Sequence, residues 1–179
     1  IPGDVLTAFH ILNDYVKKLL PEMKDPVVAA ADLGFAKKGR NFAAEINAPM
    51  AFIEKRRGGP DNHAEAITLI GEVNNRDVII VDDEIDTAGS VCEAVHLVKK
   101  HGARDVYLVT VHPVFSTPAP ERLAELPVKK IIVTNTIPIP PEKYALIKDK
   151  LVVLSVAPLL GEVINRAHEG RSVGEMFDE

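Results

Sequence analysis

Short apolar runs alternate along the chain with segments whose apolar residues recur at helical spacing. Positions 5, 9, 12, 16 and 19 are apolar, which predicts an amphipathic helix that Asp4 caps and that ends before Pro21. Two further helices are expected over residues 36–46 and 89–101. Continuous runs rich in Val and Ile predict strands over residues 26–32, 49–55, 77–83, 105–112, 129–136 and 150–157.

Strands rich in β-branched residues that alternate with helices predict an α/β fold. The expected architecture is a single domain over residues 1–179, with a parallel sheet that helices cover on both faces. Ligands of such sheets bind beyond the carboxyl ends of the strands. The loops that follow Ala31, Ile53, Val81 and Val111 are therefore the candidate positions for a site.

The stretch VIIVDDEIDTAGS, residues 78–90, places acidic residues directly after a buried strand. One acid could cap the next helix, but Thr87 and Ser90 lie closer to the start of that helix. Two adjacent carboxylates, Asp82 and Asp83, stay ionised together where a cation or several hydroxyl donors compensate them. This pattern favours a sugar diol, with or without Mg²⁺, over simple capping.

The turn after these acids is built from small residues and leads into a predicted helix. Its backbone N–H groups can surround an anion, and the dipole of the helix favours negative charge at the same point. A diol beside a phosphate describes ribose 5-phosphate. The predicted anchor for its phosphate consists of Asp86, Thr87, Ala88, Gly89 and Ser90.

Two other strand ends carry candidate residues. Asp32 follows the first strand, where capping a turn and holding a metal ion are equally compatible with its spacing. Lys55, Arg56 and Arg57 end the second strand and open the stretch RRGGPDNH. Such a basic run is commonly a solvated cluster, but cations on a mobile loop also suit phosphoryl transfer.

Composition narrows the class of partner. A net charge of -5 and a pI near 5.7 argue against nucleic acid or an anionic membrane as the main partner. Cys92 is the one cysteine, no apolar run approaches the length of a membrane span, and no signal-peptide pattern opens the chain, so a cytoplasmic location is expected. The first residue is Ile1, which suggests a fragment or a processed product.

VIIVDDEIDTAGS resembles the binding motif for phosphoribosyl pyrophosphate (PRPP) that type I phosphoribosyltransferases share with PRPP synthetases, also called ribose-phosphate diphosphokinases. The segments PVVAAADLGFAKKGRNFA, APMAFIEKRR, VYLVTVHPVFSTPAPERL and LVVLSVAPLLGEVINRAHEGRSVGEMF resemble, in order, the C-terminal half of PRPP synthetase. The likeness covers essentially the whole chain. It implies a type I phosphoribosyltransferase-like fold and a homo-oligomer, a hexamer built from dimers in this family.

The resemblance also implies a reaction and roles for residues. ATP would give its β,γ-diphosphoryl group to the 1-hydroxyl of ribose 5-phosphate, with Mg²⁺ as cofactor and AMP as product. Asp32 would help to hold Mg²⁺, Lys55 and Arg57 would be the catalytic cations, and Asp82 and Asp83 would orient the ribose. Phe35 stands where the family usually has glycine. The 179 residues alone are expected to be poorly active; a phosphoribosyltransferase and a non-catalytic subunit are the alternative functions.

Overall fold

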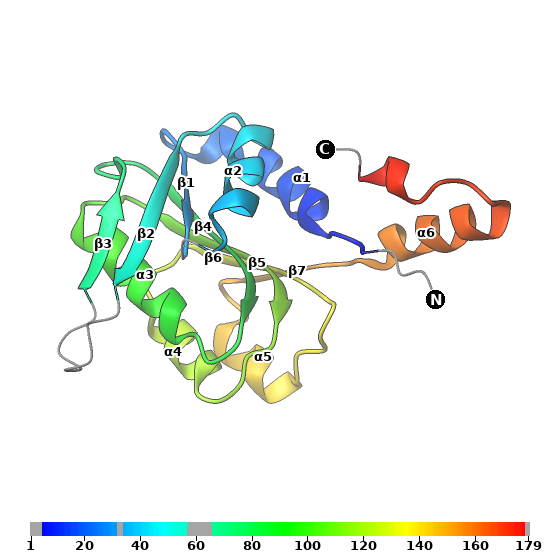
Figure 1. Cartoon of the computed structure of the whole chain (residues 1–179). Coiled ribbons are helices and arrows are strands. Elements are labelled where there is room, and N and C mark those ends of the chain that lie inside the picture. The colour runs from blue at the N-terminus through cyan, green and yellow to red at the C-terminus, as the bar shows by residue number, and fades with distance from the viewer. Residues whose placement is uncertain (1–4, 32–33, 57–65, 178–179) are drawn as a thin grey trace.

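A seven-stranded sheet forms the centre of the molecule, with strand order β3-β2-β1-β4-β5-β6-β7 (Figure 1). The computed structural model describes residues 5–31, 34–56 and 66–177, with the backbone alone at residues 55, 56, 66 and 67. The strands are β1 (Val27–Ala30), β2 (Met50–Arg56), β3 (Ala66–Ile70), β4 (Val78–Ile85), β5 (Val106–Pro113), β6 (Lys130–Thr134) and β7 (Leu151–Leu154).

The sheet is mostly parallel, as predicted, but one edge strand runs the other way. β3 pairs antiparallel with β2, and Phe52 lies opposite Ile70. No strand was predicted over Ala66–Ile70, and this unpredicted strand makes the sheet mixed at its edge. Parallel pairing of successive strands needs a crossover of about a dozen residues or more, and only residues 57–65 separate β2 from β3.

Helices cover both faces of the sheet, which confirms the predicted layers. One apolar cluster joins the sheet to α1 and α2 through side chains such as Leu12, Val16 and Phe42. The other cluster joins the opposite face to α3, α4 and α5 (Figure 1). The helices are α1 (Phe9–Leu19), α2 (Ala36–Glu45), α3 (Gly89–Lys100), α4 (Ala119–Glu125), α5 (Pro141–Ile147) and α6 (Ala157–Glu169), with short 3-10 turns η1 (Leu20–Glu22) and η2 (Gly174–Met176).

The first helix begins later than its apolar pattern predicts. α1 starts at Phe9, whose N–H donates to Thr7 Oγ1 at 3.3 Å, and Val5 is 93% exposed. The expected start at Asp4, a residue outside the described part of the chain, is therefore wrong.

α4 and α5, of 7 residues each, were not predicted, because so short a helix shows no repeating apolar period. No helix in the described part of the chain combines the length and apolarity that crossing a membrane requires.

A buried carboxylate ties together the amino-terminal edge of the sheet. Asp77, fully buried just before β4, accepts hydrogen bonds from Arg104 Nε at 2.6 Å and from the backbone N–H groups of Lys24 at 2.9 Å and Asp105 at 3.2 Å. Burial raises the pKa of Asp77, but the hydrogen bonds and the charge of Arg104 lower it more, so that pKa lies below its usual range. Asp77 thus joins the segments that lead into β1, β4 and β5.

Replacing Asp77 with Asn is expected to lower the free energy of unfolding by about 2 to 3 kcal/mol, because three donors lose a fully buried, charged acceptor. Asp105→Asn, which removes a half-exposed carboxylate from ion pairs with Lys129 and Arg104, is the matched control and should cost under about 1 kcal/mol. Urea unfolding at pH 7 measures both changes. Equal losses in the two variants would contradict the role given to Asp77.

The same interaction predicts a pH dependence. The pKa of Asp77 is lower in the folded than in the unfolded protein, so its stabilisation is complete above the unfolded value of about 3.9 and is lost as the pH falls through the folded value. The stability difference between wild type and Asp77→Asn should therefore shrink in urea titrations below about pH 4.

Candidate functional site

β4 extends beyond its neighbour β1 at the carboxyl edge of the sheet. Val81 pairs with Ala30 at the end of β1, whereas Asp82 and Glu84 pair only with β5 among the described strands. From this point β1 leads to α2 on one face and β4 leads to α3 on the other. Such a divergence is where open α/β sheets bind ligands. The strand predicted to end at residue 83 reaches Ile85, because β5 continues to pair with it.

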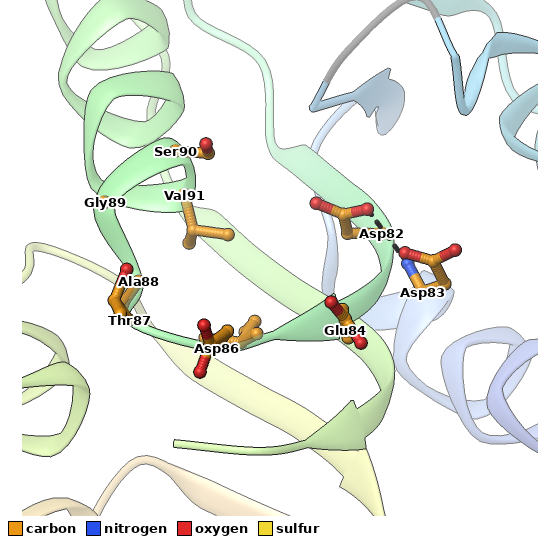
Figure 2. Close-up of a pocket in the computed structure, with 10 residues that line it drawn as sticks. Asp82, Asp83, Glu84, Asp86, Thr87, Ala88, Gly89, Ser90 and Val91 are labelled. Carbon is orange, nitrogen blue, oxygen red and sulfur yellow. Dashed lines mark hydrogen bonds between the residues drawn. The ribbon is translucent and has the colours of Figure 1, made fainter. Parts of the chain in front are cut away.

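A hollow of about 330 Å³ lies at this divergence, between the end of β4 and the start of α3 (Figure 2). Among the described residues, all those that line it come from one continuous segment. The structure therefore brings together the whole predicted sugar-phosphate segment in one concave site, whose lining is Asp82, Asp83, Glu84, Ile85, Asp86, Thr87, Ala88, Gly89, Ser90 and Val91.

The helix side of the hollow presents unpaired backbone donors. Ala88 precedes α3 in the left-handed conformation (φ 63°), and no side chain caps the helix. The first amide of this segment with a helical acceptor is that of Cys92, which donates to the Ala88 carbonyl at 3.0 Å. Within the described residues, the N–H groups of residues 88–91 donate to no protein acceptor. Free amides at a helix start form an anion site.

The strand side of the hollow carries carboxylates that point in different directions. Asp82 and Asp83 are neighbours in β4, so their side chains lie on opposite faces of the strand (Figure 2). Asp82 faces α3, and its Oδ1 accepts the N–H of Asp83 at 2.9 Å. Asp83 faces α2, where Lys38 Nζ lies 3.7 Å from its Oδ2. Lys38 is thus a cationic neighbour of Asp83.

The protein atoms around Gly89 leave room for a larger side chain. A Cβ at Gly89 would lie 3.7 Å from Arg122 Nη1 and 3.9 Å from Thr87 Oγ1, which are ordinary contacts. Gly89 also opens α3 without a positive φ. The free space beside this backbone is therefore available to a ligand.

Two residues of the site were missed by reasoning from sequence. Arg122 of α4 donates from Nη1 to the Thr87 carbonyl at 2.9 Å, and Thr110 of β5 lies beside Asp82 in the sheet. Thr110 is fully buried, and its hydroxyl has no partner within the described chain. Neither residue belongs to a local motif, so only the folded arrangement connects them with residues 82–91.

Phe35 lies in the core rather than in solvent. It is 4% exposed and packs against Phe9 with ring centroids 5.6 Å apart, while Lys38 Nζ lies 5.4 Å above its ring. Its bulk therefore packs between α1 and α2. The residue that stands in place of the family's usual glycine thus contributes to the packing that carries Lys38 toward Asp83.

Three predicted residues cannot be placed in the site. Asp32 and Arg57 lie outside the described residues, and Lys55 is described only as a backbone position of β2, opposite Ile67 of β3. Their predicted roles in binding metal and in catalysis remain predictions. Cys92 is half-buried against the core, and burial raises the pKa of its thiol, which disfavours the reactive thiolate.

Comparison with known proteins identifies the family. Residues 56–178 match the phosphoribosyl synthetase-associated domain. Ribose-phosphate pyrophosphokinases from Aquifex aeolicus and from Caldanaerobacter subterraneus subsp. tengcongensis are 41% and 45% identical to the chain over 99% of its length. The chain belongs to the ribose-phosphate pyrophosphokinase family. It spans 55% and 54% of these two relatives and corresponds to their C-terminal half, as the resemblance predicted.

A solved structure of a ribose-phosphate pyrophosphokinase relative supports the same fold. The phosphoribosylpyrophosphate synthetase of Mycobacterium smegmatis superposes on 91% of this chain and 51% of its own, with a TM-score of 0.82 and 36% identity. The predicted phosphoribosyltransferase-like α/β class is therefore confirmed, with the antiparallel edge strand β3 as the difference from the expected sheet.

Gly89→Ala in this ribose-phosphate pyrophosphokinase domain should leave the free energy of unfolding unchanged or raise it by up to about 1 kcal/mol, because the added methyl fits and alanine favours helix. Gly161→Ala is the matched control, since Gly161 lies in α6 with nothing within 4 Å of the added Cβ. Thermal and urea unfolding measure both. A loss above about 2 kcal/mol at Gly89 alone would mean that the fold itself requires this glycine.

Proposed function

We propose that the chain serves a Mg²⁺-dependent ribose-phosphate pyrophosphokinase and supplies its ribose 5-phosphate site. O1 of ribose 5-phosphate would attack the β-phosphorus of ATP. The diphosphoryl group passes to O1, AMP leaves with the electrons of the broken P–O bond, and the hydroxyl proton passes to solvent or a base. The observation that carries the proposal is the row of free amides facing the acidic end of β4 in a member of this family.

The two sides of the hollow suit the two ends of ribose 5-phosphate. A phosphate at the start of α3 accepts hydrogen bonds from the amides of residues 88–91 and gains from the helix dipole. The carboxylates of Asp82 and Asp83 accept hydrogen bonds from ribose hydroxyls. Because these acids lie at the strand side, the phosphate and the carboxylates stay separated across the hollow.

The predicted Mg²⁺ agrees with the donors in the hollow. Mg²⁺ binds through one or two carboxylates, waters and substrate phosphates rather than through a complete protein cage. Carboxylate oxygens are offered by Asp82, Asp83, Glu84 and Asp86. Among the described residues, however, no three acidic, His or Cys side chains are arranged so that they could hold a metal ion by themselves. When bound, Mg²⁺ neutralises charge on the transferred diphosphate. Asp32 is the predicted additional ligand.

Cations complete the proposed mechanism. Lys55 and Arg57 would stabilise the negative charge that spreads over the diphosphoryl group during transfer. Lys38 of α2 lies on the same side as Asp83 and is 59% exposed, which leaves it accessible to substrate.

The predicted homo-oligomer remains part of the proposal. Its support in this chain is the outer side of α6, where Leu160 and Ile164 are 44% and 69% exposed.

Ribose 5-phosphate should bind the 179-residue chain, and single variants Asp82→Asn and Asp83→Asn should weaken binding about tenfold to a hundredfold, since each removes charge-assisted hydrogen bonds. Gly89→Val should weaken it as well by filling space beside the amides. Calorimetry measures affinity, and Asp105→Asn at the opposite edge of the sheet is the control. Unchanged affinity in all three site variants would refute the proposed binding mode.

Turnover by the 179 residues alone should be slow. In the family, much of the ATP-binding surface lies in the other half, so the donor would seldom be aligned with O1, and alignment accounts for roughly 7 to 11 kcal/mol of a barrier. We expect AMP release from ATP and ribose 5-phosphate several orders of magnitude below the ordinary 1 to 10³ per second. Arg57→Ala should lower it further without changing the affinity for ribose 5-phosphate. A rate within the ordinary range from this chain alone would contradict this division of roles.

A further inference from the structure

The guanidinium of Arg122 contacts the outside of the turn that precedes α3. Arg122 lies in α4, 35 residues away along the chain, and its Nη1 donates to the Thr87 carbonyl at 2.9 Å. This is the carbonyl that would accept the N–H of Val91 if α3 began one residue earlier. Arg122 donates to this carbonyl instead, and the amide of Val91 has no protein partner among the described residues.

The same contact fixes the orientation of the peptide bond between Thr87 and Ala88. That bond is trans, so its C=O and its N–H point in opposite directions. With the carbonyl turned toward Arg122, the N–H of Ala88 is turned away from α4. Ala88 also holds a left-handed conformation, which costs a non-glycine residue about 1 kcal/mol and persists where neighbours enforce it. The hydrogen bond from Arg122 supplies such a constraint.

α4 is itself held in place by a residue of the segment that precedes β7. Lys150 Nζ donates to the carbonyls of Ala124 and Leu126 at 2.7 Å, and Leu123 of α4 is fully buried in the core. Arg122 therefore projects from a fixed element. Its charge also lies close to the amides, because Nη1 is 3.7 Å from the position of a Cβ on Gly89.

We propose that Arg122 is the positioning residue of the phosphate turn: it holds the Thr87 carbonyl outward, keeps the amides of residues 88–91 free and convergent, and so raises affinity for the phosphate of a sugar phosphate. Arg122 acts on the phosphate site through the Thr87 carbonyl, and the proposal gives it no direct contact with the substrate. The inference deepens the proposed function, and it rests on that function for the identity of the ligand.

Three substitutions separate this role from general stability. Arg122→Met removes both the donor and the charge, while Arg122→Lys keeps a charged donor that can reach the carbonyl. The matched control is Arg76→Met, because Arg76 also donates to backbone carbonyls, those of Asp25 at 2.8 Å and Pro26 at 3.3 Å, but does so at the opposite edge of the sheet. Melting temperatures of all three identify any variant that fails to fold.

Two measurements on the 179-residue chain test the inference. Calorimetry with ribose 5-phosphate should show about tenfold weaker binding for Arg122→Met, most of it restored in Arg122→Lys, and no change for Arg76→Met. Amide hydrogen exchange without ligand should be faster in Arg122→Met at Cys92, whose N–H donates to the Ala88 carbonyl of the turn, while exchange at the later amides of α3 stays as in wild type.

The outcomes distinguish the inference from the proposed function. If wild type binds ribose 5-phosphate and Arg122→Met binds it equally well, the role of Arg122 is overturned and the proposed site survives. If wild type shows no binding, the proposed ligand is wrong, and the exchange measurement alone decides whether Arg122 orders the turn. Unchanged exchange at Cys92 in Arg122→Met would overturn that role in either case.

Discussion

The unequal length of β1 and β4 is the constraint on which the site depends. β4 is the central strand of the sheet, and over Val78–Val81 it is hydrogen-bonded on both sides. β1 then ends, and β4 continues beside β5 alone through Ile85. The composition of β4 follows this change, with four fully buried apolar residues where both neighbours are present and acidic residues where one is absent. The end of β1 is what leaves this part of β4 available to a polar ligand.

The two edges of the sheet differ in whether their polar groups have hydrogen-bond partners within the protein. At the amino-terminal edge, the carboxylate of Asp77 is fully buried and receives a full set of donors from Arg104, Lys24 and Asp105. At the carboxyl edge, backbone amides and carboxylates face an open hollow, and the amides of residues 88–91 have no partner in the part of the chain that the structure describes. Satisfied polar groups stabilise the fold at one end, whereas unsatisfied groups at the other end are available to a ligand. Binding and stability are therefore separable by mutation in this domain.

The local parts of this arrangement could be predicted from sequence. The apolar run before the acids and the small-residue turn predicted a strand followed by a helix at residue 89, and α3 begins there. The end of β4 was placed too early, because acidic residues suggest a loop when their pairing with β5 is not visible. β3 was missed because its pairing depends on β2, and the start of α1 was wrong because apolar spacing continues to Val5 outside the helix. Contacts between distant segments, such as Arg122 with Thr87 and Lys38 with Asp83, have no sequence signal at all.

The central claim is that the amides at the start of α3 bind the phosphate of ribose 5-phosphate. Amide chemical shifts recorded by NMR during a titration test it most directly, with unphosphorylated ribose as the comparison. The account predicts large, saturable shifts at Ala88, Gly89, Ser90 and Val91 with ribose 5-phosphate, and little change at these amides with ribose at the same concentrations. Saturable shifts confined to other parts of the chain, with these four amides unmoved, would contradict it.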